Sequence, residues 1–254
     1  MKIGIGILCW NNFEETKNLL SFIGEEMNEN DNYFLYIVDN GSSEEQIFFL
    51  ENFECEKLKK YKFISNGANL GISISKNMFI EEMVNDKCDL VFMFDNDVIP
   101  IKNSFKAMIE YMRENPYVGC LGQHIDYYTT DMNKFLISCK NIDKIEDNKI
   151  EKNTKSGCGA FRAWTHYSVF PINVFERGIR FDESGPFGHP GYGFDDDDLG
   201  MQIHKNGYEI HCFKEECFHS INSSVPQLKK DNILNYDERK EYFKKKWGDL
   251  KNGK

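Results

Sequence analysis

Residues 90–97, Leu-Val-Phe-Met-Phe-Asp-Asn-Asp, join the most apolar segment of the chain to an abrupt acidic stop. A run of five apolar residues is typical of a strand that is buried on both faces of a sheet. Similar β-prone segments occur at 3–9, 34–38, 62–65 and 118–121. Segments with helical spacing lie between them. This alternation predicts an α/β fold whose mostly parallel sheet is covered by helices on both faces.

Helix boundaries are predicted from capping and breaking residues. Asn11 and Asn12 can cap a first helix, and a second runs through Met83. Ser104 is the expected N-cap of a third helix, which ends before Pro116 because the residue before a proline disfavours helical geometry.

Composition limits the class of protein. The chain has 254 residues, of which 41% are hydrophobic and 28% charged, as expected for a globular protein with one large domain or two small ones. Its formal net charge of −10 argues against nucleic acid as a partner. Eight cysteines form no CxxC pair, and no apolar run is long enough to span a membrane. We therefore expect a cytoplasmic protein.

Three regions are expected along the chain: a first half at 1–121, a second half at 122–225, and a basic helical tail at 226–254. Residues 126–155 are polar and without clear period, which fits a hairpin, a mobile flap or an insertion. The tail carries Tyr242, Phe243 and Trp247 beside the basic run 244–246. Two interpretations stay open for it, namely contact with an anionic membrane or lipid-linked acceptor, and a solvated helix that packs its aromatic residues on the domain.

Polar residues follow three of the predicted strands: Trp10 and Asn11, Asp39, and the Asp-Asn-Asp run 95–97. In parallel sheets, ligands bind beyond the carboxyl ends of the strands, so we expect these residues at one edge. On an extended backbone Asp95 and Asp97 point the same way, and their oxygens suit Mg²⁺ or Mn²⁺. The alternative is a solvated turn that ends the strand.

A second acidic cluster, Asp195–Asp198, follows a glycine-rich loop at 185–193 and precedes an expected helix at 199–205. One or two acids are enough to cap a helix and interact with its dipole. The remaining acids are available for chemistry, because a carboxylate near a substrate hydroxyl can act as a general base. The preceding stretch 191–194, Gly-Tyr-Gly-Phe, lets a sugar approach the backbone and stack on a ring.

The segments 9–12, 38–43, 69–77 and 94–97, taken together in this order, resemble the GT-A fold glycosyltransferases of family 2. Residues 191–199 are similar to the Gly-Trp-Gly-Gly-Glu-Asp-Asp-Asp segment of β-1,4-galactosyltransferases and polypeptide N-acetylgalactosaminyltransferases. The resemblance implies a Rossmann-like sheet. It also implies a metal-dependent, inverting transfer of a hexose from a nucleotide-diphosphate donor, most simply a UDP-sugar, to a glycan, protein or lipid-linked acceptor.

The same resemblance implies roles for individual residues. Asp95 and Asp97 would bind Mn²⁺ or Mg²⁺, with His219 completing the metal site. Asp196 would be the catalytic base. Asp195 is the alternative base, because the run of four acids allows the alignment with the family's acidic segment to shift by one residue. The residues that the resemblance places against the donor are Trp10, Asn11, Asp39, Asn69, Lys76, Asp95, Asn96, Gly159 and Ala160.

Other functions fit the sequence less well. A nucleotidyltransferase or another sugar-nucleotide enzyme ordinarily carries a basic, glycine-rich loop after the first strand, where residues 10–15 read Trp-Asn-Asn-Phe-Glu-Glu. A metal-stabilised, non-catalytic carbohydrate-binding module is a further alternative. Gly4 and Gly6 match only part of a dinucleotide fingerprint and lie inside the strand. A zinc site is a further alternative, and its candidate ligands are His211, Cys212, Cys217 and His219. Their spacing contains no CxxC or HxxxH pair of the kind that zinc sites use.

Overall fold

The computed structural model describes residues 1–123, 128–129, 144–214, 218–220 and 235–250, with the backbone alone at 128–129 and 218–220. In this part of the chain, no helix combines the length and the apolar character needed to cross a membrane. The predicted boundary at residue 225 and most of the 126–155 region lie outside the described residues.

The central sheet has eight strands in the order β3-β2-β1-β4-β9-β6-β10-β8. Strands β1 to β4 run parallel, whereas β9 is antiparallel to both of its neighbours, β4 and β6. The predicted α/β class and mostly parallel sheet are therefore confirmed. The bounds are β1 Lys2–Cys9, β2 Asn32–Asp39, β3 Leu58–Ser65, β4 Leu90–Asp95, β6 Val118–Gln123, β8 Ile150–Lys152, β9 Tyr167–Pro171 and β10 Glu209–Phe213.

A second, small sheet has the order β5-β11-β7 and begins three residues after β4 ends. Its strands are β5 Val98–Ile99, β7 Tyr128–Thr129 and β11 Phe218–Ser220. Because β11 pairs antiparallel with β5, a segment from the second half of the chain lies directly beside the Asp-Asn-Asp run.

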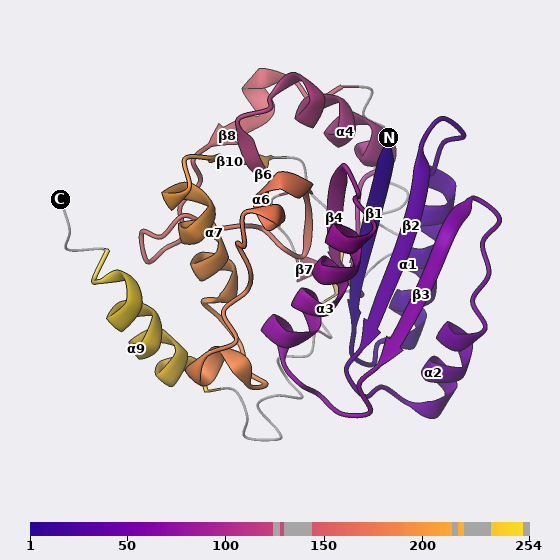
Figure 1. Ribbon diagram of the computed structural model, residues 1–254, viewed down its shortest axis with the longest axis horizontal. Coiled ribbons are helices and arrows are strands. Elements are labelled where there is room, and N and C mark those ends of the chain that lie inside the picture. The colour runs from indigo at the N-terminus through magenta and orange to yellow at the C-terminus, as the bar shows by residue number, and fades with distance from the viewer. Residues whose placement is uncertain (124–127, 130–143, 215–217, 221–234, 251–254) are drawn as a thin grey trace.

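Helices cover both faces of the central sheet (Figure 1). The apolar residues of α1 and α4 share one core cluster, and those of α3, α6 and α7 share another on the opposite face. The side chains of β4 alternate between the two, with Phe92 and Phe94 in the first and Val91 and Met93 in the second. The bounds are α1 Phe13–Glu26, α2 Glu44–Glu51, α3 Ile72–Asn85, α4 Ser104–Glu114, α6 Ile172–Glu176, η1 Asp147–Lys149, η2 Gly185–Gly188, α7 Asp195–Lys205 and α9 Tyr236–Trp247.

Helix starts differ from the sequence predictions in two places. The expected cap Ser104 is the first residue of α4, and its hydroxyl is hydrogen-bonded to the Tyr167 hydroxyl at 2.8 Å. Asn103 is the N-cap instead, with the left-handed backbone that asparagine tolerates. Helix α7 begins at Asp195 rather than Leu199, so all four aspartates lie in its first turn, where the helix dipole favours negative charge.

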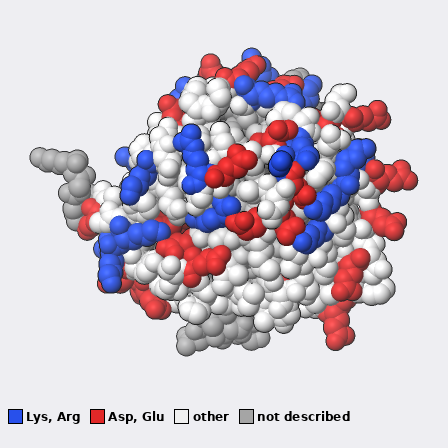
Figure 2. Space-filling view, in the orientation of Figure 1, with Lys and Arg blue, Asp and Glu red and all other residues white. Residues whose placement is uncertain are grey.

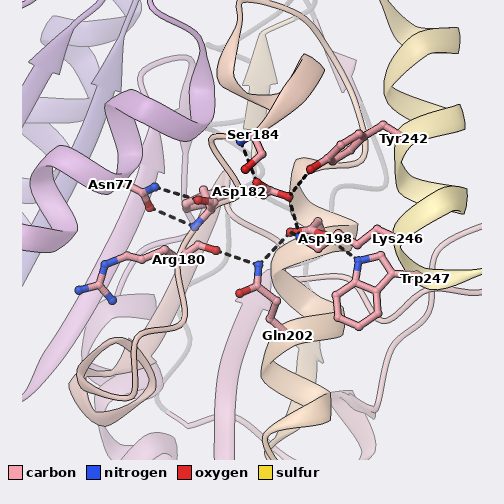
Figure 3. A network of polar contacts seen from close by, with 10 residues as sticks. Asn77, Arg180, Asp182, Ser184, Asp198, Gln202, Tyr242, Lys246 and Trp247 are labelled. Atoms are coloured by element: carbon pink, nitrogen blue, oxygen red, sulfur yellow. Dashed lines mark hydrogen bonds and ion pairs between the residues drawn. The ribbon is translucent and has the colours of Figure 1, made fainter.

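The C-terminal helix α9 packs its aromatic side chains onto the domain. Phe243 is 2% exposed and belongs to a cluster with Phe187 and Phe194. Figure 3 shows the polar side of this contact, where Tyr242 donates a hydrogen bond to Asp182 at 3.1 Å. Helix α9 therefore matches the interpretation of a helix docked on the domain, and membrane contact through its lysines stays a prediction.

Two glycines of β1 allow α3 to approach the sheet. A Cβ atom at Gly6 would lie 2.5 Å from the Phe79 ring, and one at Gly4 would lie 2.8 Å from Met83. These distances are shorter than van der Waals contact. The two glycines therefore serve helix–sheet packing, in agreement with the rejection of a dinucleotide fingerprint.

We expect Gly6→Ala to lower the free energy of unfolding by about 1–3 kcal/mol, because the added methyl overpacks the interface with α3. Gly24→Ala is the matched control. Gly24 lies in α1, and a Cβ atom there would have nothing within 4 Å, so alanine should raise stability by up to about 1 kcal/mol. Equilibrium urea unfolding measures both changes, and a Gly6→Ala protein as stable as the wild type contradicts the packing role.

Candidate functional site

The loops after β1, β2 and β4 are hydrogen-bonded to one another. The Asn96 side-chain amide donates to the Asn11 carbonyl at 2.7 Å and to the Thr16 hydroxyl at 2.8 Å. The Asn11 backbone N–H in turn donates to the Ser42 hydroxyl at 2.7 Å. Three strand ends therefore meet at one edge of the sheet, and Asn96 serves to fasten them together.

Two predicted nucleotide-binding residues also shape the loops at this edge. One carboxylate oxygen of buried Asp39 accepts hydrogen bonds from the N–H groups of Gly41 and Ser42, each at 3.0 Å. Its other oxygen has no hydrogen-bond partner among the described residues. The Asn69 side chain accepts from the Gly71 N–H at 2.9 Å, just before α3. Trp10 lies half-buried at the end of β1.

The Asp-Asn-Asp run forms a turn rather than an extended strand. Asp95 ends β4, and the next two residues turn the chain into β5. The alternation rule of strands, on which the prediction of two parallel side chains rested, therefore does not apply to Asp97. In β11, His219 pairs through its backbone with Val98, the residue after Asp97. The His219 side chain lies outside the described residues.

These residues suit a divalent cation by their chemistry. Asp95 and Asp97 are separated by one residue, and His219 pairs with Val98, the residue after Asp97. Together they offer the carboxylate and imidazole ligands that Mn²⁺ accepts. Within the described side chains alone, no group of three or more acidic, histidine or cysteine residues is placed to hold a metal ion. A zinc site at His211 is disfavoured, because its ring nitrogens are hydrogen-bonded to Tyr111 at 2.9 Å and Glu209 at 2.7 Å.

A cavity of about 690 Å³ lies beside Asp95. Its walls come from segments that are far apart in sequence, including α3, the loop before β9, the start of α7, and α9. Its charged and hydroxyl-bearing lining includes Lys76, Asp95, Arg162, Thr165, Asp196 and Lys244. The cavity does not include the predicted base and ribose pocket, since it is not lined by Trp10, Asn11, Asp39 or Asp97.

Asp195 is paired with a buried arginine from the C-terminal helix. The Arg239 side chain is 0% exposed, and its Nη2 lies 3.2 Å from Asp195 Oδ1. The same guanidinium donates to the carbonyls of Gly193 at 2.9 Å, Pro186 at 3.1 Å and His189 at 3.3 Å. Arg239 thus joins the glycine-rich loop, the start of α7 and α9.

Asp197 and Asp198 also have cationic partners. Arg162 binds Asp197 through two hydrogen bonds, of 3.2 and 3.1 Å. Lys246 lies 2.7 Å from Asp198 Oδ1, and the Trp247 indole N–H donates to the same carboxylate at 2.6 Å (Figure 3). Three of the four aspartates therefore hold the structure together.

Asp196 differs from its three neighbours. No ion pair joins its carboxylate to any described residue at salt-bridge distance, and the Thr165 hydroxyl donates a hydrogen bond to it. Burial and the nearby charge of Asp195 raise the pKa of Asp196 to about 7, against the lowering effects of Lys76, Thr165 and Arg162. A carboxylate that lines a cavity and titrates near neutral pH can accept a proton from a bound hydroxyl group.

Lys76 connects the two acidic clusters. Its ammonium group, on a residue that is 1% exposed, lies 2.9 Å from Asp95 Oδ1 and 2.9 Å from the Thr165 hydroxyl. Burial lowers the pKa of Lys76, but the negative charges of Asp95 and Asp196 raise it by more than burial lowers it. The net shift of the pKa is therefore upward. Lys76 was expected to contact the donor, and in the structure its ammonium is engaged by protein groups.

The family model described as glycosyl transferase family 2 matches residues 5–170, well over half of the chain. The chain belongs to this family. It is therefore a glycosyltransferase, and that prediction from the sequence is confirmed. No curated protein sequence matches the chain.

Solved structures agree with the GT-A fold expected for a family 2 glycosyltransferase. TarS 1–349 of S. aureus, in complex with UDP-GlcNAc, has a TM-score of 0.64 at 13% identity, covering 88% of this chain and 59% of that chain. The mannosyltransferase PcManGT of Pyrobaculum calidifontis, in complex with GDP-Man and Mn²⁺, has a TM-score of 0.58 at 12% identity, covering 99% of this chain and 65% of that chain. The present glycosyltransferase thus spans less than two thirds of either chain.

The segment before β9 contributes residues to the cavity. Gly157 and Cys158 line the cavity. Ala160 is 0% exposed and packs in the cluster beneath α9, and Gly159 turns the chain with a φ of +86°. A donor contact by Gly159 and Ala160 stays a prediction, as does the similarity of residues 191–199 to galactosyltransferases.

Three residues of this glycosyltransferase site were not found by sequence reasoning: Arg162, Thr165 and Arg239. Arg162 and Thr165 lie between segments of weak pattern and carry no motif of their own. Arg239 offered one signal, because it is the only arginine in a tail rich in lysine. A planar guanidinium that satisfies several acceptors is the group usually found in buried ion pairs, so a single arginine among lysines can indicate burial.

Proposed function

We propose that this protein is a metal-dependent, inverting glycosyltransferase that moves a hexose from a UDP-sugar to an acceptor hydroxyl group. The observation that carries the proposal is the position of Asp196. It is the member of the acidic run without a cationic partner among the described residues, and it lines a cavity that reaches Asp95. Nucleotide sugars bound by TarS and PcManGT support the choice of donor class.

On the donor side, we assign the base and ribose to the strand-end cluster of Trp10, Asn11 and Asp39. Asp95 and Asp97, with His219, would hold Mn²⁺ or Mg²⁺. When bound, the cation supplies positive charge that offsets the charge developing on the departing diphosphate. This assignment makes residues 1–121 the nucleotide-binding half and residues 122–225 the acceptor-binding half.

On the acceptor side, Asp196 removes the proton of the attacking hydroxyl group. Thr165 orients the carboxylate through its hydrogen bond, and buried Lys76 holds Thr165 in place. A base that faces the anomeric carbon from the side opposite the leaving group gives inversion of configuration. The acceptor, whether a glycan, a protein or a lipid-linked sugar, would enter through the cavity between α7 and α9.

The metal site is tested by UDP binding. We expect Mn²⁺ to strengthen UDP binding by wild-type protein at least about tenfold, because Asp95 and Asp97 would hold a cation whose positive charge would offset that of the diphosphate. Asp97→Ala should lose this gain. Isothermal titration calorimetry with UDP, in Mn²⁺ and in EDTA, measures both.

Asp237→Ala is the control, because Asp237 is an exposed acid on α9 and should leave the Mn²⁺ effect intact. Wild-type UDP affinity that is the same with and without Mn²⁺ would refute the proposed metal role. Binding of free sugar without any binding of UDP would favour a carbohydrate-binding module.

A further inference from the structure

One face of α9 forms a wall of the cavity. Tyr236, Lys240 and Lys244 follow each other at intervals of four residues, and all three line the cavity that contains Asp196. Residues four apart lie on the same side of a helix, so the two lysines and the tyrosine form one stripe along the cavity wall. We call these three residues the α9 stripe.

The ammonium groups of the α9 stripe are not neutralised within the described chain. Neither Lys240 nor Lys244 forms an ion pair or a side-chain hydrogen bond with a described residue, and both are exposed. Lys246, two residues beyond the stripe, is bound instead by Asp182 and Asp198. In Figure 2, basic side chains, interspersed with acidic ones, lie on the left of the molecule, where Figure 1 places α9.

Apart from Asp196, the acids that line the cavity already have partners. Asp95 is paired with Lys76, Asp195 with Arg239, and Asp197 with Arg162. Asp249, at the end of the α9 wall, is engaged in other contacts. In a chain of net charge −10, two cations without an ion-pair partner among the described residues therefore give this wall a local positive charge.

Two exposed tyrosines lie in the same cavity. Tyr192, in the glycine-rich loop, is 43% exposed, and Tyr236 of the α9 stripe is 41% exposed. Exposed aromatic rings offer a flat apolar surface on which the C–H face of a sugar ring can stack, with hydroxyl groups directed to polar neighbours. Rings and ammonium groups together match a sugar that carries negative charge.

We propose that the α9 stripe binds an anionic group, a phosphate or a carboxylate, on a saccharide acceptor whose ring contacts Tyr192 and Tyr236. The proposal rests on the proposed function, since it places the acceptor hydroxyl at Asp196. The stripe then selects acceptors by charge.

The test compares three sugars of similar size: glucose, glucose 6-phosphate and glucuronate. At low ionic strength we expect the wild-type protein to bind at least one anionic sugar roughly tenfold tighter than glucose. The double variant K240Q/K244Q should lose this preference, and about 0.5 M NaCl should weaken it, because exposed charges are screened. Saturation-transfer NMR and calorimetry measure the affinities, and the two anionic sugars distinguish phosphate from carboxylate.

K245Q is the matched control, because Lys245 carries the same charge on the same helix but does not line the cavity. Equal affinity for all three sugars, no binding by either anionic sugar, or an equal loss of preference in K245Q and K240Q/K244Q would overturn the proposal. The proposed function is judged separately by UDP binding with Mn²⁺. If wild-type protein binds UDP and Mn²⁺ without preferring anionic sugars, only the subsite is wrong.

Discussion

Asp196→Asn is expected to reduce glycosyl transfer by about 10²–10⁴-fold while the protein stays folded and still binds UDP. The amide has nearly the same shape as the carboxylate and can accept the Thr165 hydrogen bond, but it cannot take a proton from the acceptor. Release of UDP from a UDP-sugar in the presence of acceptor glycosides measures the rate. The melting temperature and calorimetry with UDP measure folding and donor binding.

Asp195→Asn separates the two candidate bases. Asp195 is bound by buried Arg239, so its replacement should lower the melting temperature as well as activity, because the guanidinium loses its charged partner. Full transfer activity in Asp196→Asn, together with a stable but inactive Asp195→Asn, would reassign the base to Asp195.

The pH dependence of transfer gives a second readout of the same carboxylate. Burial and Asp195 hold the pKa of Asp196 near 7, while Lys76, Thr165 and Arg162 act in the other direction. The base must be deprotonated to act, so kcat/KM should rise with pH and level off above about 7. Since this pKa lies above the ordinary value of 3.8, the folded state holds its proton more tightly than the unfolded chain. Asp196 therefore lowers stability as the pH rises from about 4 to 7.

Arg239→Met should lower the free energy of unfolding by about 3–5 kcal/mol and the melting temperature by about 10 °C. The substitution leaves Asp195 buried without its cation and leaves three backbone carbonyls of residues 186–193 without their donor. Differential scanning calorimetry measures the effect, and transfer activity should fall with it because the same loop leads into Asp196.

Lys245→Met is the control on the same helix, since this exposed side chain should change stability by less than about 0.5 kcal/mol. Arg239→Lys should rescue only part of the loss, because one ammonium group cannot reach four acceptors spread over the loop. An Arg239→Met protein that melts like the wild type would show that α9 does not hold the loop.

Local patterns predicted the parallel half of the sheet well. The apolar runs at 3–9 and 90–94 became β1 and β4 with changes of one residue at their ends, because burial on both faces leaves a continuous apolar signature. Strand β9 was not foreseen as an antiparallel member between β4 and β6. Its position depends on contacts between distant segments, which a local pattern does not contain.

The acidic runs of the candidate site were recognisable in the sequence, whereas the side chains that pair with them in the fold were not. The sequence indicated the runs at 95–97 and 195–198, yet it could not rank the four aspartates of the second run. Asp195, Asp197 and Asp198 differ from Asp196 by their ion pairs. The cations of these pairs are Arg162, before β9, and Arg239 and Lys246, both in α9, so none of them lies near the run in the sequence.

Helix α2 was not predicted either. Only two of its side chains are buried, Gln46 and Leu50, and the first of them is polar. A helix that buries so little apolar surface leaves no clear apolar stripe in the sequence.

The order in which the chain is synthesised gives the Arg239 contact a further consequence. On the ribosome, residues 195–198 emerge more than forty residues before Arg239 does. During that interval the four carboxylates repel one another without the countercharges that α9 later contributes. Of the three cationic partners only Arg162 precedes the acidic run, so we expect the turn to be less stable until α9 docks, and the base that we propose at Asp196 to be held in place only afterwards.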